Sequence, residues 1–321
     1  MITDKQLGVE ERPDPRPGPG EVLVRVHGAA LNRADLAQRA GFYAAPPGSP
    51  ADIPGVEFAG EVVAHGDGVT EPAVGARVFG IVGGGGQAEL VTVPATQCAP
   101  VPDNLDLVDA GAVPEVFMTA HDALSTQAGM RSGEVLLVHA AGSGVGTAAV
   151  QLGRVAGCTV VGTARSAEKL ESARRLGLDH AVLAPRILEP EALAADITAA
   201  VGAVDVILEL VGGTYLEADI SVAALQARIM LVGMMAGTHT DVDLGALLIK
   251  RVRIFGTTLR GRTVDEKAGV TQAFTRDVVP LLASGEVVPV VARTMPLTDA
   301  AEAYDLLASD TVFGNIVLDL R

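Results

Sequence analysis

The chain has 321 residues, 49% of them hydrophobic, and a formal net charge of −15; this suggests two domains with a large core and argues against binding to nucleic acid or anionic membranes. No apolar run reaches the roughly 18 residues of a membrane span, and the polar, acidic first residues are unlike a signal peptide, so we expect a cytoplasmic protein. The two cysteines, Cys98 and Cys158, are too few for a disulfide framework or a zinc cage.

Short strands are predicted for the first hundred residues. They fall at residues 21–27, 54–63, 75–80 and 88–93, separated by glycine and proline. In the first of them, every second residue is apolar, which places Val22, Val24 and Val26 on one face of the strand. Asn32 is placed to cap a short helical turn. Closely spaced short strands of this kind favour a partly open β-barrel.

A strand, a tight turn, a helix and a second strand follow in residues 135–163. The apolar run 135–138 predicts a buried strand, residues 147–155 a helix, and residues 158–163 a second strand. The turn between them, Ala141-Gly142-Ser143-Gly144-Val145-Gly146, is a degenerate form of the glycine pattern that holds a dinucleotide pyrophosphate at a helix N-terminus. A glycine-rich turn of any α/β protein is the alternative.

The end of the second strand indicates which dinucleotide is bound. An NAD-binding domain usually has an Asp or Glu there for the ribose 2′-hydroxyl. Here the sequence is Thr163-Ala164-Arg165-Ser166, followed by Lys169, and cations with hydroxyls suit a phosphate. We therefore predict NADPH, with Arg165, Ser166 and Lys169 at the extra phosphate. The alternative is that Arg165 and Lys169 are ordinary solvated residues at the start of a helix.

The βα pattern continues to residue 258. Strands are predicted at 180–183, 204–209, 228–232 and 253–258, with helices at 167–176, 190–201, 215–225 and 244–250. With the first two strands this makes six, the number in a doubly wound dinucleotide-binding fold. Helices are predicted at 264–284 and 299–308, and a last strand at 315–320 is expected to return to the first domain.

These motifs, in this order, resemble the medium-chain dehydrogenase/reductase superfamily over nearly the whole chain. The carrying segments are GPGEVLVRV (18–26), LNRADLAQRAGFY (31–43), PGVEFAGEV (54–62), GQAELVTVP (86–94), PEVFMTA (114–120), AGSGVGTAAVQL (141–152), ELVGG (209–213) and FGNIVL (313–318). The likeness is strongest to the zinc-free quinone oxidoreductase branch that includes zeta-crystallin.

The resemblance implies a fold and a domain arrangement. A GroES-like, partly open β-barrel domain is expected at 1–115 and 259–321, with a doubly wound Rossmann domain at 116–258. NADPH is expected in the cleft between them. The resemblance gives Thr119, Gly142, Ser143, Gly144, Val145, Gly212, Gly233, Met234 and Arg260 as further cofactor-lining positions.

No metal site is expected. In the zinc-dependent alcohol dehydrogenases of this superfamily, a Cys ligand lies in the stretch matching Asn32–Asp35 and a His at the position of Val56. Neither ligand is present here, and zinc needs three or four N, S or O ligands. Without a Lewis acid, an electron-poor acceptor such as a quinone or an enone is an easier substrate than a simple ketone.

Three residues are predicted to act on the substrate. Asn32 offers an amide donor to a carbonyl oxygen, Tyr43 a hydroxyl on the loop matching the family's G-x-Y-x-P-P-G, and Ser143 a hydroxyl in the pyrophosphate turn. Each has a structural alternative: Asn32 as a helix cap, Tyr43 as a packing residue and Ser143 as a small turn residue.

The sequence thus predicts an NADPH-dependent quinone oxidoreductase acting on a small-molecule substrate. The alternative is an enoyl or alkenal double-bond reductase acting on conjugated carbonyls or thioesters, with the same fold and hydride chemistry. A structural, non-enzymatic protein that binds NADPH without turnover is a further possibility. The resemblance also implies a homodimer, for which the apolar edge strand 253–258 is the predicted contact.

Overall fold

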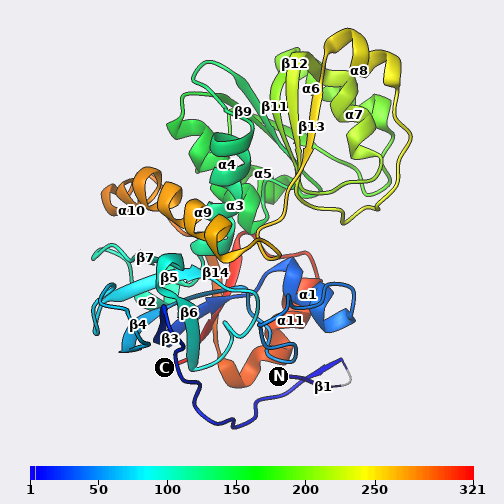
Figure 1. Cartoon of the computed structure of the whole chain (residues 1–321). Helices are drawn as coiled ribbons and strands as arrows, with labels where there is room; N and C mark the ends of the chain where they lie inside the picture. The colour runs from blue at the N-terminus through cyan, green and yellow to red at the C-terminus, as the bar shows by residue number, and fades with distance from the viewer. Residues whose placement is uncertain (4) are drawn as a thin grey trace. The chain divides into compact units, whose positions relative to one another are not determined.

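The computed structural model describes residues 1–3 and 5–321. The chain divides into two compact units (Figure 1): unit 1 comprises Met1–Met118 and Leu259–Arg321, and unit 2 comprises Thr119–Thr258. Among the described residues, no helix is both long and apolar enough to cross a bilayer.

Unit 1 is built on a seven-stranded sheet in which β3 (Glu21–Ala30) has three partners. Strand β4 (Glu57–His65) runs antiparallel along one side of β3. On the other side, β6 (Leu90–Pro94) pairs with the first half of β3 and β15 (Asn315–Asp319) with its end. The prediction that the last strand returns to the first domain's sheet is therefore confirmed.

The remaining strands and the helices complete unit 1. Strands β5 (Arg77–Ile81) and β7 (Cys98–Pro100) continue the sheet beyond β4, and β14 (Val291–Pro296) continues it beyond β15. The other elements are β1 (Ile2–Thr3), β2 (Gln6–Leu7), α1 (Arg33–Ala40), η1 (Ala95–Gln97), α2 (Leu107–Ala110), α3 (Pro114–His121, which continues into unit 2), α9 (Val264–Asp277), α10 (Val279–Ser284), η3 (Leu297–Asp299) and α11 (Ala300–Ala308). The predicted face Val22, Val24, Val26 is buried in one core cluster with Phe58 and Tyr304.

Unit 2 is a six-stranded sheet whose strands are all parallel. Their order is β10-β9-β8-β11-β12-β13, which is the arrangement of a doubly wound dinucleotide-binding domain. The strands are β8 (Val135–Val138), β9 (Thr159–Ala164), β10 (His180–Leu183), β11 (Val204–Glu209), β12 (Ala223–Leu231) and β13 (Arg253–Gly256). Helices α4 (Gly144–Val155), α5 (Ala167–Arg174), α6 (Pro190–Val201), α7 (Tyr215–Val222) and α8 (Leu244–Lys250) connect them, and the π-helical segment Asp122–Gln127 precedes β8.

Several predicted boundaries were wrong for local reasons. Helix α4 begins three residues earlier than expected, because the Ser143 side chain caps it by accepting the Gly146 N–H. The helix predicted at 264–284 is divided after Asp277, three residues before Pro280 near the start of α10. Strand β12 starts at Ala223 instead of 228, because its pairing with β11 extends across an irregularity back to Val204. The short strands β1, β2, β7 and β14 were not predicted.

Candidate active site

In unit 2, the turn after β8 holds the N-terminus of α4 close to the strand. A Cβ on Gly146 would lie 2.3 Å from the Ala140 carbonyl oxygen, so this contact requires glycine. The Ala141 N–H donates to the Thr163 carbonyl of β9 at 2.9 Å and fixes the start of the turn. The first N–H groups of a helix have no intrahelical acceptor and are available to an anion. The N–H groups of Gly144 and Val145, the first two residues of α4, could therefore bind an anion, and Gly142 lies in the turn just before them.

The predicted phosphate-binding residues follow β9, the strand next to β8 in the sheet. Ser166 caps α5 by accepting the Lys169 N–H at 3.3 Å, and its hydroxyl also donates to Glu168. The aliphatic part of Lys169 passes close to Gly142, where an added Cβ would meet it at 3.0 Å. Arg165 is exposed. Because β8 and β9 are parallel, these residues and the turn lie at the same edge of the sheet.

The loop after β11 lies at this edge as well, because β11 is parallel to β8. Gly212 and Gly213 adopt positive φ angles of 73° and 58°, and Gly212 bridges to Gly237. A Cβ on Gly233 would lie 2.2 Å from the Leu210 carbonyl oxygen. The predicted cofactor positions Gly212 and Gly233 are thus close neighbours through Leu210. Met234 beside them is 64% exposed, and Thr119 is buried on α3.

In unit 1, Asn32 is held by a buried carboxyl group. The Asn32 side-chain amide donates to Glu57 Oε1 at 2.6 Å, and Glu57 Oε2 accepts the Glu115 N–H at 2.8 Å. Asn32 is the N-cap of α1, as predicted, and its own N–H donates to Asp35. Since an amide nitrogen carries two hydrogens, Asn32 keeps a second N–H for a ligand.

Burial changes the protonation of three carboxyl groups around Asn32. It raises the pKa of Asp35 to about 6, although Asp35 accepts the N–H groups of Asn32 and Gly55. It raises the pKa of Glu57 well above the usual range. It also raises the pKa of Glu115 to about 7, helped by the charge of Asp35 and opposed by Arg260 and Lys267. This part of unit 1 therefore holds acidic protons near neutral pH, where a reaction could use them.

Arg260 anchors the loop that carries Tyr43. The guanidinium donates to the Gly83 carbonyl at 2.7 Å, to the Tyr43 carbonyl at 3.0 Å and to Gln38 Oε1 at 2.6 Å, and it lies 4.9 Å from the centre of the Tyr43 ring. These contacts leave Arg260 only 4% exposed. Its contact with the cofactor stays a prediction. Burial, followed by the charge of Glu115, raises the pKa of Tyr43, which keeps the phenol protonated at neutral pH.

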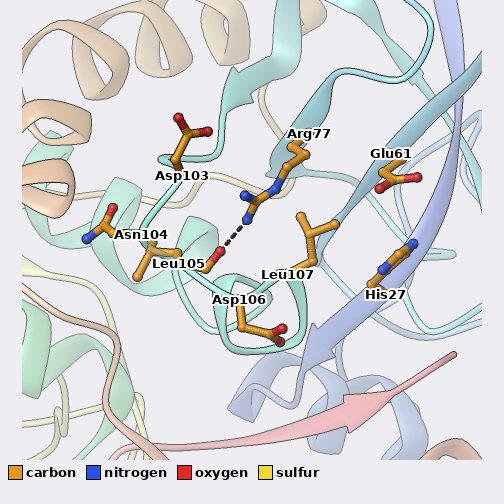
Figure 2. Close-up of a pocket in the computed structure, with 8 residues that line it drawn as sticks. All are labelled: His27, Glu61, Arg77, Asp103, Asn104, Leu105, Asp106 and Leu107. Atoms are coloured by element: carbon orange, nitrogen blue, oxygen red, sulfur yellow. Dashed lines mark hydrogen bonds between the residues drawn. The ribbon is translucent and has the colours of Figure 1, made fainter.

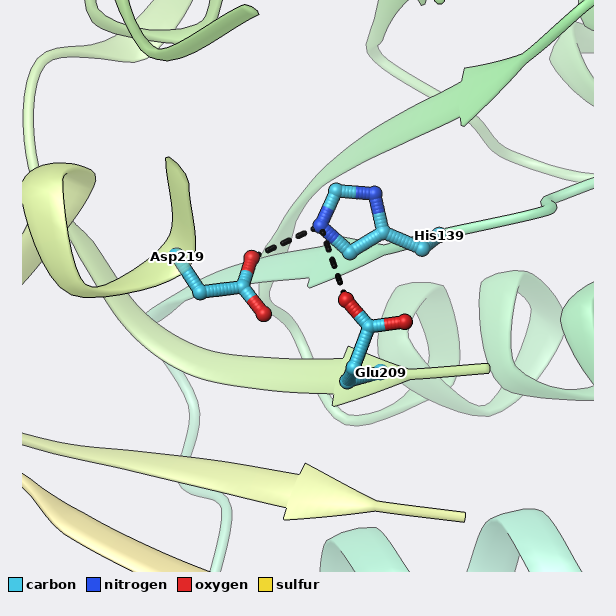
Figure 3. A group of neighbouring side chains, drawn as sticks. All are labelled: His139, Glu209 and Asp219. Atoms are coloured by element: carbon cyan, nitrogen blue, oxygen red, sulfur yellow. Dashed lines mark hydrogen bonds and ion pairs between the residues drawn. The ribbon is translucent and has the colours of Figure 1, made fainter. Parts of the chain in front are cut away.

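The residues at the position of the family's catalytic zinc do not fit that metal. Asn32 and Val56 supply neither thiolate nor imidazole, and both Glu57 oxygens already accept hydrogen bonds. Among the described residues, one group of three His, Cys, Asp or Glu side chains brings ligand-type atoms within 4.8 Å of one another: His139, Glu209 and Asp219. That group is buried inside unit 2 (Figure 3).

A surface pocket in unit 1 is lined by other residues. Figure 2 shows its lining residues, which come from β3, β4, β5, the segment before α2 and the first residue of α2: His27, Glu61, Arg77, Asp103, Asn104, Leu105, Asp106 and Leu107. The Arg77 guanidinium donates to the Leu105 carbonyl. None of the predicted site residues lines this pocket.

Sequence reasoning missed three ionisable residues near Asn32. Glu57 binds the Asn32 amide, the Glu115 N–H binds Glu57, and the charge of Lys267 acts on Glu115. Glu57 and Glu115 carry a signal in the sequence, because each is a carboxylate within an otherwise apolar or small-residue stretch. Lys267 gives no such signal, since it follows Asp265 and Glu266 at the start of a polar helix. Asn32, Tyr43 and Arg260 belong to unit 1, and the other predicted site residues belong to unit 2.

Comparisons with known proteins agree with this architecture. The family model "Alcohol dehydrogenase GroES-like domain" matches residues 18–103, and the model "Zinc-binding dehydrogenase" matches residues 144–276. A solved structure of Escherichia coli quinone oxidoreductase complexed with NADPH has 28% identity and a TM-score of 0.83, and the match covers 97% of this chain and 95% of that one.

Curated relatives include proteins of very different length. Quinone oxidoreductase of Rattus norvegicus is 32% identical over 312 residues, which are 95% of this chain and 90% of the relative. A mycocerosic acid synthase-like polyketide synthase of Mycobacterium tuberculosis is 31% identical over 306 residues; the match covers 95% of this chain but only 14% of the synthase. With a parallel six-stranded unit, a GroES-like unit and these relatives, the chain belongs to the medium-chain dehydrogenase/reductase superfamily, which includes quinone oxidoreductase-like members.

Proposed function

We propose that the chain is an NADPH-dependent oxidoreductase that reduces a quinone or a similar electron-poor acceptor without zinc. The observation that carries this proposal is the turn after β8, where Gly146 holds the N-terminus of α4 against the strand. The absence of Asp and Glu from residues 163–166 favours the phosphorylated cofactor. The likeness to a quinone oxidoreductase complexed with NADPH supports the same assignment.

The residues divide the work between binding and proton supply. When bound, NADPH supplies the hydride. The second N–H of Asn32 binds the acceptor oxygen and stabilises its developing negative charge, while Glu57 fixes the orientation of the amide. Tyr43, protonated at neutral pH, donates the proton that completes the reduction. The Ser143 hydroxyl caps α4, and through this bond it orients the turn that binds the pyrophosphate.

Replacing Tyr43 by Phe is expected to lower kcat about 10- to 100-fold while NADPH affinity stays unchanged. The phenol is removed, but water can partly replace it as proton donor. The ring that Arg260 contacts is retained, so the loop keeps its shape. The measurement is steady-state turnover with a quinone, together with the Kd of NADPH.

Phe42→Leu is the matched control, because Phe42 is the neighbouring residue and is 87% exposed. It should keep the wild-type turnover. Full activity of the Tyr43→Phe variant would make Tyr43 a packing residue and assign the proton to another group.

Replacing Arg165 and Lys169 together by Ala is expected to lower the preference for NADPH over NADH about 10- to 100-fold. Each charge-assisted hydrogen bond to a phosphate contributes about 1.5–3 kcal/mol. NADH lacks the 2′-phosphate that makes these bonds, so its binding should change little. The measurement is the ratio of kcat/KM for the two cofactors. Arg174→Ala with Arg175→Ala, two exposed residues at the end of the same helix, should leave the ratio unchanged. An unchanged ratio in the Arg165 and Lys169 variant would refute the phosphate assignment.

A second candidate function is the reduction of conjugated double bonds in enones or acyl thioesters. The likeness to a segment of a polyketide synthase favours it. Following NADPH absorbance with quinones, enones and enoyl thioesters would separate the two activities. NADPH binding without turnover of any of these would instead support the non-enzymatic alternative.

We also propose that the protein is a cytoplasmic homodimer. Strand β13 is an outer strand of the unit 2 sheet, and an edge strand of this kind can pair with a second copy. Leu244, Leu248 and Ile249 on α8 are 74%, 77% and 75% exposed, which is unusual for large apolar side chains. Sedimentation of the purified protein as a monomer would refute this proposal.

A further inference from the structure

Three ionisable side chains meet in the interior of unit 2 (Figure 3). His139 follows β8, Glu209 ends β11 and Asp219 lies on α7, and all three are fully buried. His139 Nε2 lies 2.7 Å from Asp219 Oδ1 and 3.8 Å from Glu209 Oε2. The other imidazole nitrogen hydrogen-bonds the Thr163 hydroxyl at 2.8 Å. The two hydrogen bonds join the end of β8 to β9 and α7, and the 3.8 Å contact brings the end of β11 beside them.

Two carboxyl oxygens in this cluster lack a partner. Carboxyl oxygens of Glu209 and Asp219 lie within 4.8 Å of each other, yet Glu209 Oε2 and Asp219 Oδ2 have no hydrogen-bond donor among the described groups. An unpaired buried carboxylate is costly. His139 cannot satisfy both groups, because its Nε2 is at hydrogen-bonding distance from Asp219 alone. A proton held by the two carboxyl groups, or a cation bound by them, would remove this cost.

The geometry favours a proton over a metal ion. Ligands bound to zinc at 2.0–2.1 Å in a tetrahedron are about 3.3 Å apart. His139 Nε2 and Asp219 Oδ1 are 2.7 Å apart, which is a hydrogen-bond distance. We propose that Glu209 and Asp219 share one buried proton, and that this proton makes them positioning residues for the loop from Leu210 to Gly213.

The link to that loop is direct. Glu209 Oε1 accepts the N–H groups of Val211 and Gly212, the latter at 2.8 Å. Gly212 belongs to the predicted cofactor site, so the effect on catalysis rests on the proposed function. Without the shared proton, two negative charges would face each other in a dry interior. Moving Glu209 away from Asp219 would then carry the backbone of Val211 and Gly212 with it.

The groups around the pair keep the proton in place at neutral pH. Burial raises the pKa of both Glu209 and Asp219, and the charge of Asp219 raises that of Glu209 further, so that the pair releases its shared proton only near pH 8. Burial also lowers the pKa of His139. Tyr215 of α7 packs edge-on against the His139 ring with centroids 4.9 Å apart. The positive charge of Arg165 acts on Tyr215, so the charged or titratable groups beside the pair include His139, Tyr215 and, through Tyr215, Arg165.

The shared proton has a signed effect on stability. The unfolded chain loses this proton near pH 4, so between about pH 4 and 8 the folded pair holds one proton more than in the unfolded chain. Below about pH 6.5 His139 offsets this difference, because the unfolded chain protonates an imidazole that stays neutral in the folded unit. The net effect of the cluster is therefore a fall in stability from about pH 6.5 to 8, by up to tenfold in the unfolding equilibrium constant per pH unit. Above about pH 8 the pair is ionised, and NADPH affinity should fall by up to tenfold per pH unit.

The test compares wild-type protein with Glu209→Gln. The glutamine side chain can donate to Asp219 and accept from the loop, so it imitates the protonated state at every pH. We expect the variant to lose the infrared carbonyl band of a buried protonated carboxyl group. We also expect its stability to fall less than that of wild type between about pH 6.5 and 8, and its NADPH affinity to stay constant above pH 8. Glu217→Gln, a half-buried position on α7, is the matched control and should behave as wild type.

The outcomes separate this inference from the proposed function. Parallel stability curves for wild type and variant, or stoichiometric divalent metal in the purified protein, would overturn the shared proton. If the NADPH affinities of wild type and Glu209→Gln change in parallel above pH 8, the positioning role is overturned. If NADPH binds to neither protein but the infrared and stability differences remain, the proposed function fails and the shared proton stands. Asp219→Asn, which supplies the donor from the other side, replaces Glu209→Gln if that variant does not fold.

Discussion

Replacing Gly146 by Val is expected to weaken NADPH binding by at least about 100-fold. A side chain at this position would meet the Ala140 carbonyl oxygen at 2.3 Å and the Ala141 Cα at 2.9 Å. Neither backbone group can move without shifting the turn, so α4 would be pushed away from β8. The N–H groups at its N-terminus would then no longer converge on the pyrophosphate. Isothermal titration with NADPH measures the loss.

Two further variants test whether the close contact itself causes this loss. Gly146→Ala introduces only the Cβ and should give a smaller loss in the same direction, with unit 2 destabilised by about 1–3 kcal/mol. Gly256→Ala is the control, because a Cβ there has nothing within 4 Å, and it should bind NADPH normally. Wild-type affinity in Gly146→Ala would show that the tight contact does not shape the binding turn.

Unit 2 was predictable because its determinants are local. The strand Val135–Val138, the helix Pro190–Val201, the strand Val204–Glu209 and the helix Leu244–Lys250 were predicted with the bounds that the structure has. Each is a periodic apolar segment bounded by turn residues, so the pattern alone defines it. The predicted start of α4 and the predicted end of α7 were less accurate. The Ser143 cap sets the first, and the pairing of β12 with β11 sets the second.

The contacts around Asn32 were not predictable because they join distant parts of the chain. Asn32 and Glu57 are 25 residues apart, and Glu57 and Glu115 are 58 apart. Arg260 reaches residues 177 to 222 positions earlier in the sequence. No spacing rule connects such positions. The sequence suggested Asn32 and Tyr43 as separate residues, and only the fold shows that Glu57 holds one while Arg260 holds the other.

The second large effect is expected at Glu57, whose replacement by Gln should lower kcat about 10- to 100-fold. Glutamine keeps the size of the side chain but turns one acceptor oxygen into an NH2 donor. That donor must face either the Asn32 amide or the Glu115 N–H, which now bind the two Glu57 oxygens. One buried hydrogen bond is lost, at a cost of about 1–3 kcal/mol, and the Asn32 amide turns away from the acceptor oxygen.

A double-mutant cycle shows whether this loss acts through Asn32. If Glu57 serves to orient that amide, Asn32→Ala and Glu57→Gln should each reduce kcat, and the double variant should be little slower than the slower single variant. Glu61→Gln on the same strand β4, a half-buried position, should keep the wild-type kcat, and NADPH affinity should stay constant throughout. Losses that multiply in the double variant would mean that Glu57 and Asn32 act independently, and the proposed oxyanion contact would then have to come from another donor of unit 1.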